Sequence, residues 1–214
     1  SILPKLIVLD LDNTLWTPEL YQIRKPNCPK ANKEIRLFPG SISILQHMAD
    51  HREEWQSTQL AIASRTNKAH WARQLLEDFE INGRPIRSLF PYIEIRTGSK
   101  KNHFANLRDA TGIEYRDMLF FDDDANLNLE EISHLGIMCS HCPRGLTSAL
   151  FVATLQKYES LKAQHERNFM GYILSAVSLG LEEAQEVDEG RVTTGTIKFF
   201  NPTKRFGFVK EDNE

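Results

Sequence analysis

Short apolar runs alternate with stretches of helical periodicity over roughly the first 145 residues. The apolar runs fall at residues 6–9, 60–63, 92–95, 118–121 and 136–139. Side chains that are apolar at consecutive positions indicate strands buried on both faces, as in parallel sheets. Between the runs, apolar residues recur at i, i+3 and i+4, which predicts amphipathic helices. These helices begin near Pro39, after a predicted cap at Asn67, and after Ser99.

The alternation of strands and helices predicts the architecture. A β-α-β-α order favours an α/β fold, a three-layer sandwich with a mainly parallel sheet. Only about 50 residues separate the first apolar run from the second, which leaves room for a short flap but for no large cap domain. The carboxyl ends of parallel strands meet at one edge of a sheet, where ligands bind in such folds.

The second part of the chain changes character twice. A helical extension is expected from Ser148, with a further helix over residues 172–181, and it ends in an acidic stretch at residues 182–189. Residues 195–209 then read as strands with interleaved aromatic and basic side chains. We therefore predict three segments: a main domain at 1–163, a helical, acidic linker at 164–190, and a short β segment at 191–214.

Composition narrows the class of protein. Hydrophobic residues make up 41% and charged residues 26% of the 214 positions, which is typical of a globular protein in water. A formal net charge of -3 gives no overall attraction to nucleic acid or to an anionic membrane. No apolar run approaches the roughly 20 residues of a membrane span, so no membrane partner is expected.

Cysteine usage bears on location and metal binding. Three cysteines do not form a disulfide framework, so a cytoplasmic, reducing location is expected. The sequence begins with Ser1 rather than Met, which leaves open a targeting segment ahead of it. The close pair Cys139 and Cys142 has no second pair at zinc-site spacing. It is interpreted as a strand end and the loop after it.

The most informative chemistry lies at the end of the first apolar run, where Asp10 and Asp12 are two positions apart. Alternate side chains of an extended chain share one side, so both carboxylates can reach the same small space. Two such anions repel by about 4 kcal/mol at an effective dielectric near 20. A divalent cation or a shared proton would offset that repulsion. Ser64 and Asp123 follow two other apolar runs, which places polar side chains at the ends of three strands.

These motifs, in this order, resemble a known family. The residues concerned are Asp10-Leu11-Asp12-Asn13-Thr14-Leu15-Trp16, Ala63-Ser64-Arg65-Thr66, Gly98-Ser99-Lys100 and Phe120-Phe121-Asp122-Asp123. They resemble the haloacid dehalogenase superfamily, and within it the small magnesium-dependent phosphatases that lack a cap domain. The resemblance covers roughly residues 3–160 and implies a Rossmann-like fold.

The resemblance implies a role for each motif. Asp10 would be the nucleophile that forms an aspartyl-phosphate, and Asp12 would be the general acid and base. Ser64 would hydrogen-bond a phosphoryl oxygen, and Lys100 would offset the charge of Asp10 and of the phosphate. Arg65 would contact the substrate, although packing is an equally good explanation. The neighbouring Lys101, an exposed lysine in the simpler interpretation, is the alternative to Lys100.

The implied cofactor is Mg²⁺. Its ligands would be Asp10, the backbone carbonyl of Asp12, and Asp123, since a few protein oxygens completed by water and phosphate suit this ion. Asp122 would orient these groups. Which of Asp122 and Asp123 binds directly stays open, with Asp123 favoured. The expected activity is hydrolysis of a phosphomonoester. The substrate class stays open between a phosphotyrosine protein and a phosphorylated small molecule such as a sugar phosphate.

The last segment resembles an incomplete cold-shock, or OB-like, domain. Its proposed nucleic-acid contacts are Lys198, Phe199, Phe206 and Phe208, because aromatic faces stack bases and cations hold phosphates. This supplies an alternative function: a protein that binds single-stranded nucleic acid, with the phosphatase-like domain as its scaffold. A third possibility joins the two, with the tail bringing a phosphatase to its substrate.

Overall fold

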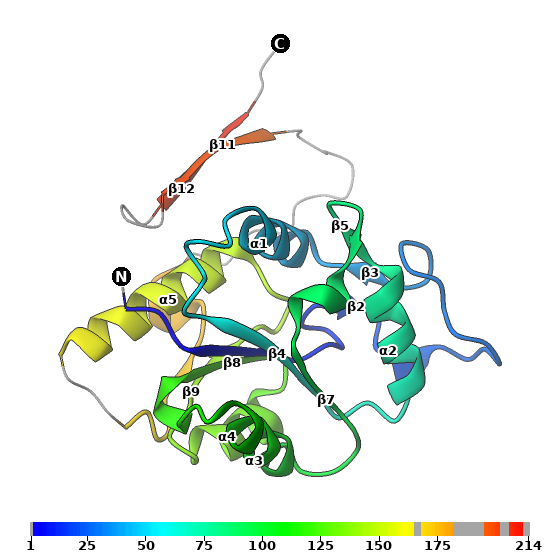
Figure 1. Cartoon of the computed structure of the whole chain (residues 1–214), viewed down its shortest axis with the longest axis horizontal. Helices are drawn as coiled ribbons and strands as arrows, with labels where there is room; N and C mark the ends of the chain where they lie inside the picture. Colours follow the sequence, from blue (N-terminus) through cyan, green and yellow to red (C-terminus); the bar gives the residue numbers. More distant parts are fainter. Residues whose placement is uncertain (1, 165–167, 182–194, 202–205, 212–214) are drawn as a thin grey trace.

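A single parallel sheet forms the centre of the molecule in the computed structural model, which describes residues 2–164, 168–181, 195–201 and 206–211. The sheet has six strands in the order β10-β9-β8-β1-β4-β7 (Figure 1). Its members are β1 (Leu6–Leu9), β4 (Gln59–Ser64), β7 (Tyr92–Ile95), β8 (Met118–Asp122), β9 (Met138–His141) and β10 (Ile173–Leu174). Each neighbouring pair is parallel, which confirms the predicted α/β class.

Helices cover both faces of the sheet and make the three layers. They are α1 (Pro39–Asp50), α2 (Ala69–Asp78), α3 (Lys100–Thr111), α4 (Glu130–Ser133) and α5 (Ser148–Ala163). The alternation of side chains along β1 shows which helix lies on which face. Ile7 and Leu9 belong to one core cluster with side chains of α1, α2 and α5, whereas Leu6 and Val8 belong to another with α3 and α4. Figure 1 shows α3 and α4 on one side of the sheet, with α1 and α5 on the other.

Short elements complete the described part. Two small antiparallel ladders pair β2 (Trp16–Thr17) with β3 (Arg36–Leu37) and β5 (Glu80–Ile81) with β6 (Arg84–Pro85). The one-turn segments are η1 (Leu20–Gln22), η2 (Ile86–Leu89), η3 (Tyr115–Asp117), η5 (Val177–Leu179) and η4 (Ala125–Leu129), the last with π-helical bonding. The stretch between β1 and β4 therefore holds β2, η1, β3 and α1 and no separate cap domain, as predicted.

Two predicted boundaries are wrong by a few residues. Helix α2 begins at Ala69 with Lys68 at its cap position, and Asn67 does not cap it. The strand expected at residues 136–139 runs instead from Met138 to His141. Gly136 has a φ of 85°, a left-handed conformation that ends the preceding turn and delays the strand.

The helix expected over residues 172–181 is also wrong. Ile173–Leu174 is instead the edge strand β10, parallel to β9. The physical reason is that the two side chains point to opposite faces: Leu174 is buried in one core cluster and Ile173 packs against the other. The sheet thus reaches beyond residue 163. The division into segments 1–163, 164–190 and 191–214 stays a prediction, and the acidic stretch at 182–189 lies outside the described residues.

The short β segment forms a hairpin of β11 (Gly195–Asn201) and β12 (Phe206–Glu211). The two strands are antiparallel, with Phe199 opposite Phe208. Within the described parts of the chain, no helix is both long and apolar enough to cross a bilayer.

Candidate active site

The ends of three adjacent strands bring the predicted acidic and polar residues together. Strand β1 lies between β4 and β8 in the sheet, so Asp10, Ser64 and Asp122 all emerge at the same edge. The backbone N–H of Asp10 donates to the carbonyl of Phe121 at 3.0 Å, which extends the β1–β8 pairing to the first acid. Asp123, which the sequence analysis placed at this edge with Asp10 and Ser64, follows Asp122 directly, and its carboxylate lies with those of Asp10 and Asp122.

Three carboxylates gather at this edge. Asp10, Asp122 and Asp123 each offer an oxygen, and these oxygens all lie within 4.8 Å of one another. Burial raises the pKa of Asp10 well above its usual range, although Lys100 opposes the shift. Burial, reinforced by the charge of Asp122, raises the pKa of Asp123 to about 6. The positive charge nearby thus does not balance the three close carboxylates. Their oxygens are the donors that a hard divalent cation prefers.

Lys100 is the cation inside the cluster. Its side chain is fully buried, and its Nζ donates to Asp10 Oδ1 at 2.7 Å and to Asp122 Oδ2 at 2.5 Å. The third hydrogen bond goes to the carbonyl of Ala63 at 2.8 Å, so the ammonium is saturated. Burial alone would lower the pKa of Lys100, but the charges of Asp10 and Asp122 outweigh it and the pKa is raised.

The start of α3 holds Lys100 in place. Ser99 is the N-cap, and its Oγ accepts from the backbone N–H of Lys101 at 3.1 Å. The carboxylate of Glu131, on α4, accepts from the hydroxyl of Ser99 and from the backbone N–H of Lys100. Among the described residues, the hydrogen-bond partners of buried His103, also on α3, are backbone carbonyls, including that of Ser64. It is therefore a core histidine, in keeping with its position on a helix.

The neighbours Asp122 and Asp123 have different surroundings. Asp122 is fully buried, and its oxygens accept from Lys100, from the side-chain amide of Asn128 at 3.1 Å and from the backbone N–H of Asp124 at 2.8 Å. Asp123 is less buried and lines the pocket, while its backbone carbonyl accepts from His141 Nε2 at 2.9 Å. Asp122 is thus committed to internal partners, whereas Asp123 faces the pocket.

Asp12 lies beside the three carboxylates, and two N–H groups outside that cluster hold its side chain. Trp16 Nε1 donates to Asp12 Oδ1 at 2.7 Å, and the backbone N–H of Leu20 donates to Asp12 Oδ2 at 3.3 Å. Burial raises the pKa of Asp12 to about 6, against these two hydrogen bonds, which lower it. A carboxyl group with a pKa of about 6 has both its acid and its carboxylate form accessible near neutral pH, which suits general acid and base work.

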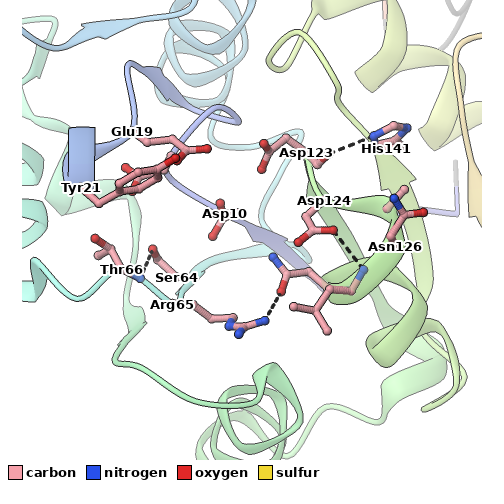
Figure 2. Close-up of a pocket in the computed structure, with 14 residues that line it drawn as sticks. Asp10, Glu19, Tyr21, Ser64, Arg65, Thr66, Asp123, Asp124, Asn126 and His141 are labelled. Carbon is pink, nitrogen blue, oxygen red and sulfur yellow. Dashed lines mark hydrogen bonds between the residues drawn. The ribbon is translucent and has the colours of Figure 1, made fainter. Parts of the chain in front are cut away.

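Ser64 and Arg65 both line the pocket (Figure 2). The hydroxyl of buried Ser64 accepts from the backbone N–H of Thr66 at 3.4 Å. Arg65 Nη1 donates to Asn128 Oδ1 at 2.9 Å, so Asn128 connects this arginine with Asp122. The hydrogen bond to Asn128 gives Arg65 a structural partner, and its predicted contact with the substrate stays a prediction.

These groups open into a pocket of about 630 Å³. It is lined by Asp10, Asp12, Glu19, Tyr21, Ser64, Arg65, Thr66, Asp123, Asp124, Ala125, Asn126, Leu127, Asn128 and His141. Two large apolar side chains, Tyr21 and Leu127, remain 63% and 51% exposed there. They come from η1 and η4, while the carboxylates lie at the strand ends. The pocket therefore combines a charged interior with apolar side chains that a substrate can contact.

Sequence reasoning missed several lining residues, among them Glu19, Tyr21, Leu127, Asn128 and His141. A signal existed for Asn128, a polar residue between Leu127 and Leu129 shortly after the acid pair, because such a polar position is rarely buried without a partner. Glu19 and Tyr21 gave none, since they lie in an irregular segment. Glu19 accepts from the side chain of Asn13 at 2.6 Å, and Asn13 itself has a left-handed φ of 55°.

The proposed nucleic-acid residues Lys198, Phe199, Phe206 and Phe208 all lie in the β11–β12 hairpin. Their role in binding stays a prediction.

Comparison with known proteins identifies relatives of this chain. The Acid Phosphatase family profile matches residues 2–161. Human magnesium-dependent phosphatase 1 is 35% identical over 155 residues, which cover 67% of this chain and 81% of that protein. A HAD-like hydrolase superfamily protein of Schizosaccharomyces pombe is 32% identical over 149 residues, 63% of this chain and 83% of the relative. None of these matches supports the cold-shock-like interpretation of the hairpin or a nucleic-acid partner.

Solved structures agree on the fold. An uncharacterized protein from Listeria monocytogenes serotype 4b has a TM-score of 0.54 at 14% identity, over 82% of this chain and 93% of its own. A haloacid dehalogenase-like family hydrolase from Xanthomonas campestris has a TM-score of 0.50 at 10% identity, over 75% of this chain and 100% of its own. These likenesses show the fold, and the profile match and the human relative confirm the family resemblance of the motifs. The chain belongs to the Acid Phosphatase family of haloacid dehalogenase-like phosphatases.

Proposed function

We propose that the chain is a magnesium-dependent phosphomonoesterase that works through an aspartyl-phosphate on Asp10. One observation carries the proposal: Asp10 lies at the pocket, bonded to buried Lys100, with oxygens of Asp122 and Asp123 within 4.8 Å. A carboxylate so placed is both a nucleophile and a metal ligand. The name of the human relative, magnesium-dependent phosphatase 1, supports the same assignment.

The residues present fit Mg²⁺. Lys100 pairs with Asp10 and Asp122 but not with the third carboxylate, Asp123, so the cluster retains negative charge, and all its donors are oxygens. Asp10, Asp123 and the backbone carbonyl of Asp12 would hold the ion, while Asp122 keeps Lys100 and Asn128 in place. Bound there, Mg²⁺ would neutralise and polarise the phosphoryl oxygens.

The first chemical step belongs to Asp10. A carboxylate oxygen of Asp10 attacks phosphorus in line, a bond forms between them, and the bond to the leaving oxygen breaks. Lys100, fixed on Asp10 Oδ1 at 2.7 Å, offsets the negative charge that gathers as the phosphate approaches. Ser64 and Arg65 line the same pocket and would hold the phosphoryl oxygens.

Asp12 transfers a proton in each of the two steps. In its acid form it protonates the leaving oxygen, and as a carboxylate it then takes a proton from the water that hydrolyses the aspartyl-phosphate. Its pKa, raised to about 6 by burial, makes both forms accessible near neutral pH. Phosphate is released and the carboxylate of Asp10 is restored.

The substrate stays open between a phosphoprotein and a phosphorylated small molecule such as a sugar phosphate. An open pocket without a cap domain would admit either. Exposed Tyr21 and Leu127 would contact an apolar leaving group, and the carboxylates of Glu19 and Asp124 would disfavour an acidic one.

The defining experiment measures phosphate release from 4-nitrophenyl phosphate with Mg²⁺ and with a chelator. We expect turnover that requires the metal, and acid-quenched enzyme that carries a phosphoryl group on the peptide containing Asp10, located by mass spectrometry. Turnover that is unaffected by chelation would contradict the metal assignment. A phosphoryl group on another residue would contradict the nucleophile.

Replacing Asp122 and Asp123 one at a time should show which of them binds the metal directly. Asp123→Asn should raise the Mg²⁺ concentration for half-maximal activity about 10-fold or more, with little change in melting temperature, because it removes a ligand at the pocket. Asp122→Asn should instead lower the stability by about 1–3 kcal/mol, because buried Lys100, Asn128 and the Asp124 N–H lose a charged acceptor. Magnesium titrations and thermal melts of both variants measure this. The reverse pattern would assign Asp122 as the direct ligand.

A further inference from the structure

Trp16 makes a contact that its apolar surroundings do not explain. Its side chain is fully buried at the start of β2 and packs against Phe79, with ring centroids 6.0 Å apart. Its Nε1 nevertheless donates to Asp12 Oδ1 at 2.7 Å, a short distance for a bond between an N–H and a carboxylate oxygen. A buried indole N–H needs an acceptor, and here that acceptor is the side chain of a carboxylate at the pocket and not a backbone carbonyl of the core.

The two oxygens of Asp12 are held unequally. An indole N–H can only donate, so Oδ1 is fixed as an acceptor whatever the state of the carboxyl group. Oδ2 accepts only from the backbone N–H of Leu20 among the described residues, at the longer distance of 3.3 Å. A proton on Oδ1 would weaken the shorter bond, because a hydroxyl oxygen is a poorer acceptor than a carbonyl or carboxylate oxygen. The indole bond therefore holds Oδ1 more firmly than the longer backbone bond holds Oδ2.

We propose that Trp16 is a positioning residue that holds Asp12 Oδ1 and leaves Oδ2 as the atom that gives and takes the proton. The inference rests on the proposed function. In the first step the Oδ2–H bond breaks and the proton goes to the leaving oxygen as its bond to phosphorus breaks. In the second, Oδ2 takes a proton from the attacking water while phosphorus leaves Asp10.

The two steps respond differently to the loss of Trp16. An acidic phenol leaves as an anion and needs little protonation, whereas an alcohol needs the proton as its bond breaks. The value of kcat/KM reports phosphoryl transfer to Asp10, and hydrolysis of the intermediate contributes to kcat. A misplaced general acid therefore affects kcat/KM strongly for an alkyl phosphate and weakly for an acidic aryl phosphate.

The test compares wild type with Trp16→Phe on 4-nitrophenyl phosphate and glycerol 2-phosphate. We expect kcat/KM to fall about 10- to 100-fold more for glycerol 2-phosphate than for 4-nitrophenyl phosphate. For 4-nitrophenyl phosphate, kcat should fall more than kcat/KM, because hydrolysis of the intermediate still needs Asp12. Asp12→Asn should show the same dependence on the leaving group, only larger.

Phe79→Leu is the matched control. It removes the ring that packs on Trp16 but keeps the indole N–H, so kcat/KM should change by the same small factor for both substrates. Equal losses for both substrates in Trp16→Phe would overturn the proposal. Absence of metal-dependent turnover in wild type with every substrate would instead refute the proposed function, so the two failures are distinguishable.

A spectroscopic readout covers the case in which Trp16→Phe does not fold. The chain has three tryptophans, and the indole N–H of Trp16 should give a nitrogen–proton NMR resonance shifted downfield by its charged acceptor. Asp12→Ala should move that resonance upfield and leave the other two in place. A resonance that does not move would overturn the proposal.

Discussion

Asp10→Asn should abolish turnover and leave the fold intact. The amide cannot attack phosphorus, so we expect kcat to fall by roughly 10⁴- to 10⁶-fold, as for other enzymes that lose a nucleophile. The fold should tolerate the change, because one of three crowded carboxylates becomes neutral while Lys100 keeps its ion pair with Asp122. Phosphate release with 4-nitrophenyl phosphate and a thermal melt of the metal-free protein measure the two effects.

The expected melting temperature of Asp10→Asn without metal is equal to or above that of wild type. Asp109→Asn, on the exposed end of α3, is the matched control, and both its turnover and its stability should stay close to wild type. Phosphate release by Asp10→Asn at a rate near the parent's would contradict the nucleophile assignment. A large fall in its melting temperature would show that the carboxylate of Asp10 is needed for folding.

Lys100→Met should lose both activity and stability. The methionine keeps an unbranched side chain but leaves Asp10 and Asp122 without their shared cation in a buried site. Breaking a buried ion pair in this way costs about 3–5 kcal/mol, and turnover should fall by at least about 10²-fold because the approaching phosphate meets uncompensated charge. Urea unfolding and steady-state kinetics test both parts.

Two further variants make that result interpretable. Lys101→Met, the exposed neighbour, should change the free energy of unfolding by no more than about 0.5 kcal/mol and should keep wild-type turnover. Adding Asp122→Asn to Lys100→Met should recover part of the lost stability, because one of the two unpaired charges is removed. Equal effects of the two lysine variants would show that the interpretation of Lys100 as the buried cation is wrong.

The parts of the site that sequence reasoning found are those fixed by regular structure. Asp10, Ser64 and the acid pair Asp122 and Asp123 follow apolar runs, and the geometry of a parallel sheet brings the ends of adjacent strands together. Lys100 follows a helix cap, so its place at the start of α3 was also predictable. In these cases a short local pattern determines the long-range position.

The parts that were missed depend on irregular backbone. Glu19 and Tyr21 reach the pocket from the cap position and the middle of η1, and Asn128 reaches it from the π-helical η4. No periodic pattern predicts where such turns direct a side chain. The hydrogen bond from Trp16 to Asp12 was not predicted, because core packing is a sufficient explanation for a tryptophan in an apolar stretch. The two-residue strand β10 was mistaken for a helix because so short an apolar stretch fits both periodicities.

The position of β1 in the sheet has a consequence for how the site opens. Its backbone is paired on both sides, with β4 and β8, and the amide of Asp10 continues this pairing by donating to Phe121 of β8, so its exchange with solvent requires β1 and β8 to separate at that end. Tyr21 and Leu127 lie on one-turn segments that can fluctuate without that separation. The carboxylate that we propose as the nucleophile is thus tied to the most stable part of the sheet, while the two side chains that we propose contact the leaving group lie outside it and can move at little cost to the core.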